Sequence, residues 1–279
     1  PPPPPPPTPP PAFPSADGIR DTSVTGVQTC ALPICLFSPY RARNNFFGTL
    51  SAPAFPTSFT LQKIAHLGHH RRNRTDEELY DYYLPNQSKF LRNFQLYSGN
   101  LMGFYWFCIP LSNLIYLVTP WLYTSRAFIE GPARHLGFEP YIREIAQHSI
   151  LKIWLECFLA LVYQVAIWWA LDLSWQGWLL WYWAFALHWS ALHYVDHAWS
   201  RRDVVNGAWD LKVLPTTRAL ALNYHYHLAH HRHPQAPWTE LPALVDNDER
   251  RPTFWRIYFR LWGGTRPAPP MGGASTLGA

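Results

Sequence analysis

Three long apolar runs constrain the fold of this chain more than any other feature of its sequence. They cover residues 101–123, 150–171 and 177–195, and each approaches the roughly 20 residues that an α-helix needs to cross a bilayer. Only 15% of the residues are charged, whereas the chain holds 15 Trp, a residue that favours the membrane–water interface. The sequence therefore predicts an all-α fold, in the form of an integral membrane helical protein.

Histidines gather at the boundaries of these runs. The pattern HxxHH occurs twice, as His66, His69 and His70 and again as His227, His230 and His231. Positions i, i+3 and i+4 share one face of a helix, so each triplet can direct three imidazoles at one point. His193 and His197, spaced i, i+4, close the last apolar run. Because imidazole binds iron, zinc, copper and nickel, we predict that all eight are metal ligands.

Groups beside a metal site orient its imidazoles. A metal-bound histidine usually donates its other ring N–H to a carboxylate or a carbonyl. We predict this supporting role for Asp76 and Asp196, and also for Asn223 and His225 next to the second triplet. Asp76 and Asp196 have an alternative role as solvated or helix-capping residues. The ExxH pair of soluble di-iron bundles does not occur in the sequence.

The positions of the histidines also indicate a topology. Two clusters that build one site must lie on one side of the membrane, so an even number of crossings separates them. We therefore predict a transmembrane hairpin from residues 150–171 and 176–197. The run at 101–123 contains Pro110 and Pro120, which interrupt a helix, so we expect it to lie in the interface or to re-enter.

Basic residues flank the histidines. They are Arg71, Arg72, Arg201 and Arg202. Since cytoplasmic flanks of membrane spans are rich in Lys and Arg, we predict a cytoplasmic, histidine-rich helical cap. The net charge of +5 could also indicate a nucleic-acid partner, but basic clusters beside apolar runs fit membrane flanks better, so we predict no nucleic-acid binding.

The two ends of the chain lack the pattern of a folded core. Residues 1–18 are proline-rich, and residues 24–34 resemble the in-frame translation of a sequencing-library adapter. We therefore expect residues 1–35 to be a non-native or disordered leader, residues 36–262 to form the membrane domain, and the Gly-, Pro- and Ala-rich residues 263–279 to be a disordered tail. Residues 75–83, with acids at their start, predict a short polar helix.

Two segments carry a resemblance to a known family. His66-Leu67-Gly68-His69-His70, followed by Arg71-Arg72-Asn73-Arg74-Thr75, and Asn223-Tyr224-His225-Tyr226-His227-Leu228-Ala229-His230-His231 resemble motifs of the membrane fatty acid desaturase and hydroxylase superfamily. The segment 194–212 is also similar, and the resemblance covers residues 36–262. It implies two iron ions held by three histidine boxes and one extra histidine. The two triplets match the second and third boxes, and His197 matches the extra histidine, with His193 one turn earlier.

The resemblance implies a reaction and partners. These are O2, a fatty acyl or similar lipid chain in the membrane, and desaturation of that chain. Electrons would come from an external ferredoxin or cytochrome b5-type donor, because the sequence has no flavin fingerprint and no four-cysteine iron–sulfur motif. The four arginines are candidate docking residues for it. Alternatives are hydroxylation, carotenoid ketolation or alkene-forming decarboxylation, and, from other classes, a metal-binding membrane transporter or an inactive remnant.

One expected motif has no counterpart. The family's first histidine box should precede the second, and Leu36-Phe37-Ser38 resembles the sequence that follows that first box. The adapter-like segment ends at this point. We therefore expect the first box to be missing, and the chain as written to bind metal incompletely and to be inactive. Iron analysis and turnover of the purified chain test this expectation.

Overall fold

Helices account for nearly all regular structure in residues 41–134, 138–234 and 236–277, which are the residues that this computed structural model describes. The α-helices are α1 (Arg41–Ser51), α2 (Phe59–Arg72), α3 (Lys89–Phe94), α4 (Cys108–Val118), α5 (Arg126–Phe128), α6 (Glu139–Ile145), α7 (Ile150–Ala170), α8 (Trp175–Val195), α9 (Pro215–Leu220), α10 (His227–Arg232) and α11 (Phe254–Leu261). Short 3-10 or π turns are η2 (Ala52–Ala54), η3 (Gln95–Leu101), η4 (Phe104–Phe107), η5 (Pro120–Thr124), η6 (Ile129–Ala133) and η7 (Leu241–Ala243). Strands β1 (Tyr82–Tyr83) and β2 (Arg266–Pro267) form one parallel pair. The mostly helical class is confirmed, and the predicted leader at 1–35 lies outside the described residues.

Serine residues define where the three longest helices begin. Ser58, Ser149 and Ser174 precede α2, α7 and α8, and each side chain accepts a hydrogen bond from a backbone N–H of the first turn. Such caps satisfy donors that a helix cannot satisfy internally. Local sequence therefore sets the start of α2, which carries the first histidine triplet.

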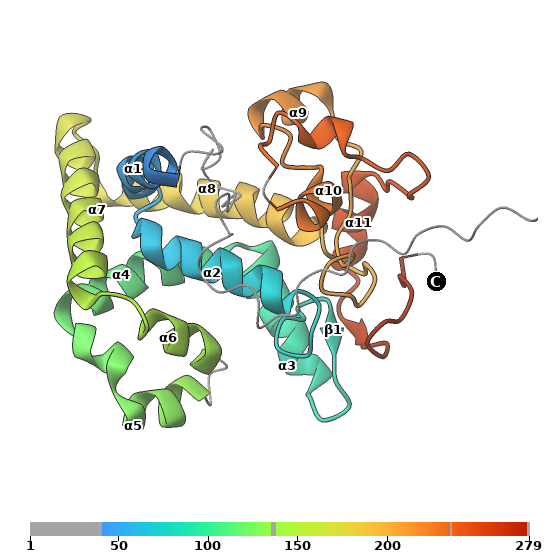
Figure 1. Cartoon of the computed structure of the whole chain (residues 1–279), viewed down its shortest axis with the longest axis horizontal. Coiled ribbons are helices and arrows are strands. Elements are labelled where there is room, and N and C mark those ends of the chain that lie inside the picture. The colour runs from blue at the N-terminus through green and yellow to red at the C-terminus, as the bar shows by residue number, and fades with distance from the viewer. Residues whose placement is uncertain (1–40, 135–137, 235, 278–279) are drawn as a thin grey trace, which may run out of the picture.

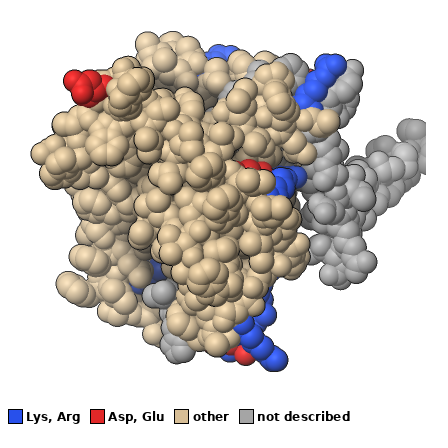
Figure 2. Space-filling view, turned by 90° about the vertical axis from the view of Figure 1, so that its left-hand side faces the viewer, with Lys and Arg blue, Asp and Glu red and all other residues tan. Residues whose placement is uncertain are grey.

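One wall of the molecule is suited to lipid. Within the described residues, α7 is the single helix that is both long and apolar enough to cross a membrane. Lys89–Leu101 and Phe104–Val118 form a second candidate, bent by 69° at Met102–Gly103. The run at 101–123 is thus interrupted, but α4 contains Pro110 and ends before Pro120, so Pro110 is not the cause. Figure 2 shows that the face on the α7 side of Figure 1 is almost free of charged residues. Burying charge-free surface in lipid costs no ion desolvation.

The predicted transmembrane hairpin is wrong in its packing. Both helices have 21 residues, and Trp178 Nε1 donates to Gln164 Oε1 across 3.2 Å near their connection. Beyond it, α7 packs mainly on η2, α4 and α2, whereas α8 packs on η3, η4 and α11. In Figure 1, α7 stands upright at the left and α8 runs across the molecule. The α8 sequence mixes Trp, Tyr and His with its apolar residues, which lowers its hydropathy below that of a span.

The predicted helix at residues 75–83 is also wrong. Arg74 has φ +61°, a left-handed conformation that does not continue a right-handed helix. Its guanidinium forms two hydrogen bonds, of 2.7 and 3.0 Å, with the Asp81 carboxylate, and both side chains are buried. This buried ion pair stabilises a looped segment that ends in β1.

The tail predicted to be disordered is packed against the rest of the chain as far as Leu277. Strand β2 pairs with β1, and Leu277 is fully buried in a cluster with Tyr82, Trp199 and Ile257. Ser275 Oγ donates to the Trp199 carbonyl over 2.8 Å. Composition alone missed this contact, because one apolar residue at the end of a polar segment carries little sequence signal.

Candidate metal centre

Three segments bring the histidines together. His66, His69 and His70 lie on the last two turns of α2, and His197 lies in the turn that follows α8. The second triplet lies on α10, which begins at His227 itself. Asp210 Oδ1 accepts a 3.1 Å hydrogen bond from the backbone N–H of Ala229 and so fixes the first turn of α10.

Seven histidines form two adjoining groups. The four-histidine group consists of His69, His197, His227 and His231, and the three-histidine group consists of His66, His70 and His230. In each group the potential ligand atoms lie within 4.8 Å of one another. Each group combines side chains from α2 and from α10, so neither helix holds a complete group.

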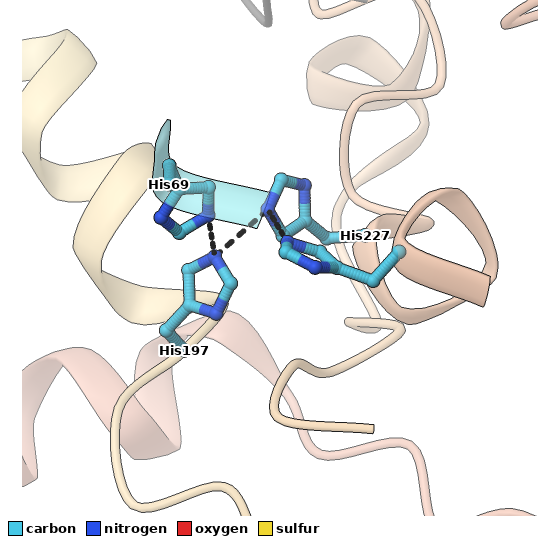
Figure 3. A group of neighbouring side chains, drawn as sticks. His69, His197 and His227 are labelled. Carbon is cyan, nitrogen blue, oxygen red and sulfur yellow. Dashed lines mark hydrogen bonds between the residues drawn. The ribbon is translucent and has the colours of Figure 1, made fainter. Parts of the chain in front are cut away.

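The four-histidine group converges on its Nε2 atoms. His197 Nε2 lies 3.0 Å from His69 Nε2 and 2.9 Å from His227 Nε2. His231 Nε2 lies 3.2 Å from His227 Nε2. Figure 3 shows the labelled rings of His69, His197 and His227 turning their nitrogens toward one another from different elements.

The three-histidine group forms a triangle that hydrogen bonds cannot satisfy. Its Nε2–Nε2 distances are 3.1 Å for His66–His70, 3.0 Å for His70–His230 and 3.4 Å for His66–His230. A neutral imidazole nitrogen is either a donor or an acceptor. Each of the three Nε2 atoms is either a donor or an acceptor, so at least two of them are alike. At least one of the three contacts therefore joins two donors or two acceptors, which is unfavourable unless a cation binds the nitrogen lone pairs.

The spacing also fits an ion. Metal–imidazole bonds are about 2.0–2.1 Å long for zinc, and two such ligands at right angles lie about 3.0 Å apart. The Nε2 contacts of 2.9–3.2 Å within the four-histidine group match this distance. Imidazole is a ligand for iron as well as for zinc and copper. The donor set therefore suits two metal ions, one in each group.

Burial keeps these imidazoles in the metal-binding, neutral form. It lowers the pKa of His66, His70 and His231 well below the ordinary imidazole value, and neighbouring imidazoles lower it further. The same causes lower the pKa of His230 to about 3. A metal ion binds neutral imidazole and competes with protons, so the pocket favours an ion over protonation.

The outer ring nitrogens contact oxygens that set the ring orientation. His69 Nδ1 lies 2.6 Å from Glu78 Oε1, and His197 Nδ1 lies 2.7 Å from the Gly207 carbonyl oxygen. An oxygen acceptor at Nδ1 leaves the Nε2 lone pair free for a metal. The Asp196 carboxylate is fully buried, and its Oδ2 lies 3.5 Å from His227 Nδ1 without forming a hydrogen bond, so its supporting role stays a prediction.

Sequence reasoning missed Glu78. An acidic run follows the first triplet, but the sequence does not indicate which acid of that run faces the histidines, and the predicted one was Asp76. The structure places Asp76 on Arg202, at 2.6 Å, with its side chain 65% exposed. Because the predicted helix is absent, the looped chain after Arg74 directs Glu78 instead toward His69.

Three other predicted residues lie outside the two groups. His193 Nδ1 lies 3.2 Å from the Tyr224 hydroxyl, one helical turn before His197. Asn223 has φ +62° and donates its amide to the Trp238 carbonyl over 3.1 Å, so it shapes a loop. His225 is buried, and burial lowers its pKa to about 4, but its ring packs on Tyr226 at 4.0 Å between centroids. The geometry therefore does not support these three in their predicted roles.

The candidate docking arginines differ in exposure. The Arg202 side chain is 3% exposed and binds Asp76 and the Pro269 carbonyl, so it cannot present its charge to a partner. Arg71 and Arg72 share the Glu144 carboxylate, at 2.5 and 2.8 Å, and Arg71 remains exposed, as does Arg201. The expected docking role is therefore wrong for Arg202, and it stays a prediction for Arg71, Arg72 and Arg201.

A cavity of about 250 Å³ borders the histidines. His66, His69, His193 and Glu78 line one part of it. The rest combines apolar or aromatic residues, Leu61, Ala65, Trp106, Ile109, Tyr141 and Trp189, with the polar Thr57, Gln62 and Ser112. Concave sites lined mainly by apolar side chains with a few polar groups are typical of small-ligand pockets. An apolar chain in this cavity would lie directly beside both histidine groups.

The fold and the site define a class: a helical protein with a membrane-suited wall and a two-part histidine centre. The fatty acid desaturase family model matches residues 36–262, which is more than half of the chain. The chain therefore belongs to the fatty acid desaturase family. No curated protein and no solved structure matched it in the corresponding searches.

Proposed function

We propose that this chain is an O2-dependent di-iron oxidoreductase that desaturates a fatty acyl or similar lipid chain. The proposal rests on one observation: a member of the desaturase family holds two adjoining histidine groups, one of four side chains and one of three. The bound irons supply the binding and reduction of O2, chemistry that protein side chains lack.

The residues of the chain supply ligands, orientation and substrate position. Glu78 and the Gly207 carbonyl hold the rings of His69 and His197, and the apolar cavity holds methylene groups beside the centre. Desaturation takes two hydrogens from adjacent methylenes, and two electrons and two protons complete the reduction of O2 to two waters. Positioning within the cavity then decides which carbons react.

The electrons come from an external donor of the ferredoxin or cytochrome b5 type, on the cytoplasmic side of the membrane. Arg71 and Arg201 are exposed, and Arg71, which shares Glu144 with Arg72, directly follows His70. Complementary charge speeds such an encounter. Replacing Arg71 and Arg201 by Ala should slow donor-dependent turnover at low salt and have little effect at high salt, where charges are screened.

Product analysis tests the proposal. Nothing in the structure tests the expectation that the chain as written is inactive because its first histidine box is missing; we propose activity because seven histidines already assemble in two groups, and absence of turnover by the wild-type chain would favour the earlier expectation. The chain, in membranes with a donor, receives fatty acids, and gas chromatography with mass spectrometry identifies the products. A new carbon–carbon double bond that His66→Ala and His230→Ala abolish, and His188→Ala retains, is the expected result; His188 is an exposed α8 residue outside both groups. Hydroxylated, ketolated or chain-shortened alkene products would instead assign one of the related reactions, and products independent of His66 and His230 would overturn the proposal.

A further inference from the structure

A buried acid links the membrane-suited helix to the helix that carries the first histidine triplet. Within α7 the charged residues are Lys152 and Glu156. The Lys152 side chain is 59% exposed, whereas that of Glu156 is 7% exposed. A buried carboxylate is costly unless it is hydrogen-bonded, so its contacts are informative.

The three hydrogen bonds of the Glu156 carboxylate are all made with the start of α2, and its Oε1 also lies 3.8 Å from Lys152 Nζ, one turn earlier in α7. Glu156 Oε2 accepts hydrogen bonds from Ser58 Oγ, at 2.6 Å, and from the backbone N–H of Thr60, at 2.7 Å. Its Oε1 accepts a third from Thr60 Oγ1, at 3.0 Å. A carboxylate at a helix N-terminus satisfies unpaired N–H groups and interacts favourably with the helix dipole. Charge-assisted hydrogen bonds of this kind are the stronger ones.

The next residue of α7 strengthens the same connection. Cys157 Sγ donates to Asn113 Oδ1 over 3.3 Å, and Asn113 Nδ2 donates to the Pro56 carbonyl. Gln164, two turns further along α7, donates to the Pro53 carbonyl over 2.7 Å. The segment leading into α2 is thus held by the buried Asn113 of α4 and the half-buried Gln164 of α7, and Glu156 contacts α2 itself.

The two histidine groups depend on α2 to different degrees. The three-histidine group takes His66 and His70 from α2, whereas the four-histidine group takes His69 alone. An α-helix behaves as a short rigid rod with a rise of about 1.5 Å per residue. A shift or rotation at Thr60 therefore moves all three rings, and it displaces two ligands of the smaller group but one of the larger.

We infer that Glu156 is a positioning residue for the metal centre, which acts by fixing the N-terminus of α2 and thereby the placement of His66 and His70. This inference rests on the proposed two-metal site. It assigns a second role to α7, in addition to facing lipid. Through Glu156, α7 fixes the position of α2, the helix that carries two of the three histidines of the smaller group.

The test is a Co²⁺ titration of the purified chain in detergent, with Co²⁺ as a visible stand-in for iron. The variants are Glu156→Gln, and Glu130→Gln as the matched control, since Glu130 forms an exposed ion pair with Arg126. Thr60→Val removes one of the three hydrogen bonds and keeps the side-chain shape, so it gives a milder variant if Glu156→Gln does not fold. Each variant is also made in a His230→Ala background.

We expect wild type to bind two ions, and Glu156→Gln to bind one of them about tenfold more weakly with altered Co²⁺ absorption bands. The His230→Ala background should remove this difference, because the affected group is already broken. Equal affinities in Glu156→Gln and Glu130→Gln, or an equal loss at both ions that follows a lower unfolding temperature, would overturn the inference. A wild-type chain whose Co²⁺ binding is absent, or is insensitive to His66→Ala and His227→Ala, would overturn the proposed metal centre and this inference with it.

Discussion

His70 and His230 are 160 positions apart in the chain, and their Nε2 atoms lie 3.0 Å apart. This contact joins the two HxxHH motifs. Each motif divides its side chains between the two groups: α2 gives two to one group and one to the other, and α10 does the reverse. The two ion sites are therefore interleaved.

The interleaving predicts non-additive losses. His70→Ala and His230→Ala should each abolish one of two bound irons, and the double variant should lose no more than either single one, because all three changes break the same group. Iron per chain, measured by mass spectrometry of the purified protein, checks this. His188→Ala should retain the wild-type iron content. Loss of two irons in the double variant alone would show that the residues belong to different sites.

The contact between Glu78 and His69 predicts that replacing Glu78 weakens metal binding, although Glu78 is not one of the grouped ligands. Glu78→Gln keeps an oxygen acceptor but removes the negative charge of this partner, and it should weaken metal binding about tenfold, the lower end of the usual effect of changing a group beside a ligand histidine. Glu77→Gln is the matched control, because the adjacent Glu77 side chain is 60% exposed and lies 3.8 Å from Arg72. Competition with a chromophoric chelator measures both affinities, and equal values would contradict the assigned role.

The buried Arg74–Asp81 pair predicts a large loss of stability. Asp81→Ala would leave the guanidinium of Arg74 buried without its counter-charge, which costs about 3–5 kcal/mol of unfolding free energy. Glu130→Ala, which breaks the exposed pair with Arg126, should leave the unfolding free energy almost unchanged, because solvent screens such pairs. Urea unfolding in detergent micelles compares the two, and similar small losses would show that the pair contributes little.

The cavity beside the histidines predicts a change in chain-length preference. Ile109 lines this cavity, and Ile109→Phe should reduce its volume and shift the products toward shorter acyl chains. Ile115→Phe on the same helix is the control, because Ile115 is 39% exposed and does not line the cavity. Competition between acyl chains of different length, read by mass spectrometry, checks this. An unchanged product distribution would place the substrate elsewhere.

The sequence predicted the helical class and all seven grouped histidines. The i, i+3, i+4 spacing selects one helix face for the six in the two triplets, and His197 was indicated by its place at the end of the last apolar run. It did not predict which histidines share an ion. The assignment of histidines to groups depends on how α2 packs against α10. A local sequence pattern does not show how segments 160 positions apart come into contact. The choice between Asp76 and Glu78 depends on the left-handed turn at Arg74, which an acidic run does not reveal. The packing of α7 and α8 likewise depends on tertiary contacts rather than on apolar length.

The division of both histidine groups between α2 and α10 has a consequence for biosynthesis. The ribosome releases α2 first, then α7 and α8, and α10 only later. Neither group can be completed before α10 has emerged. The first histidine triplet therefore lacks its partners while α7 and α8 are synthesised. A metal ion that requires either complete group could therefore bind only late in maturation, and a nascent chain arrested before His227 would carry the first triplet and His197 but neither complete group.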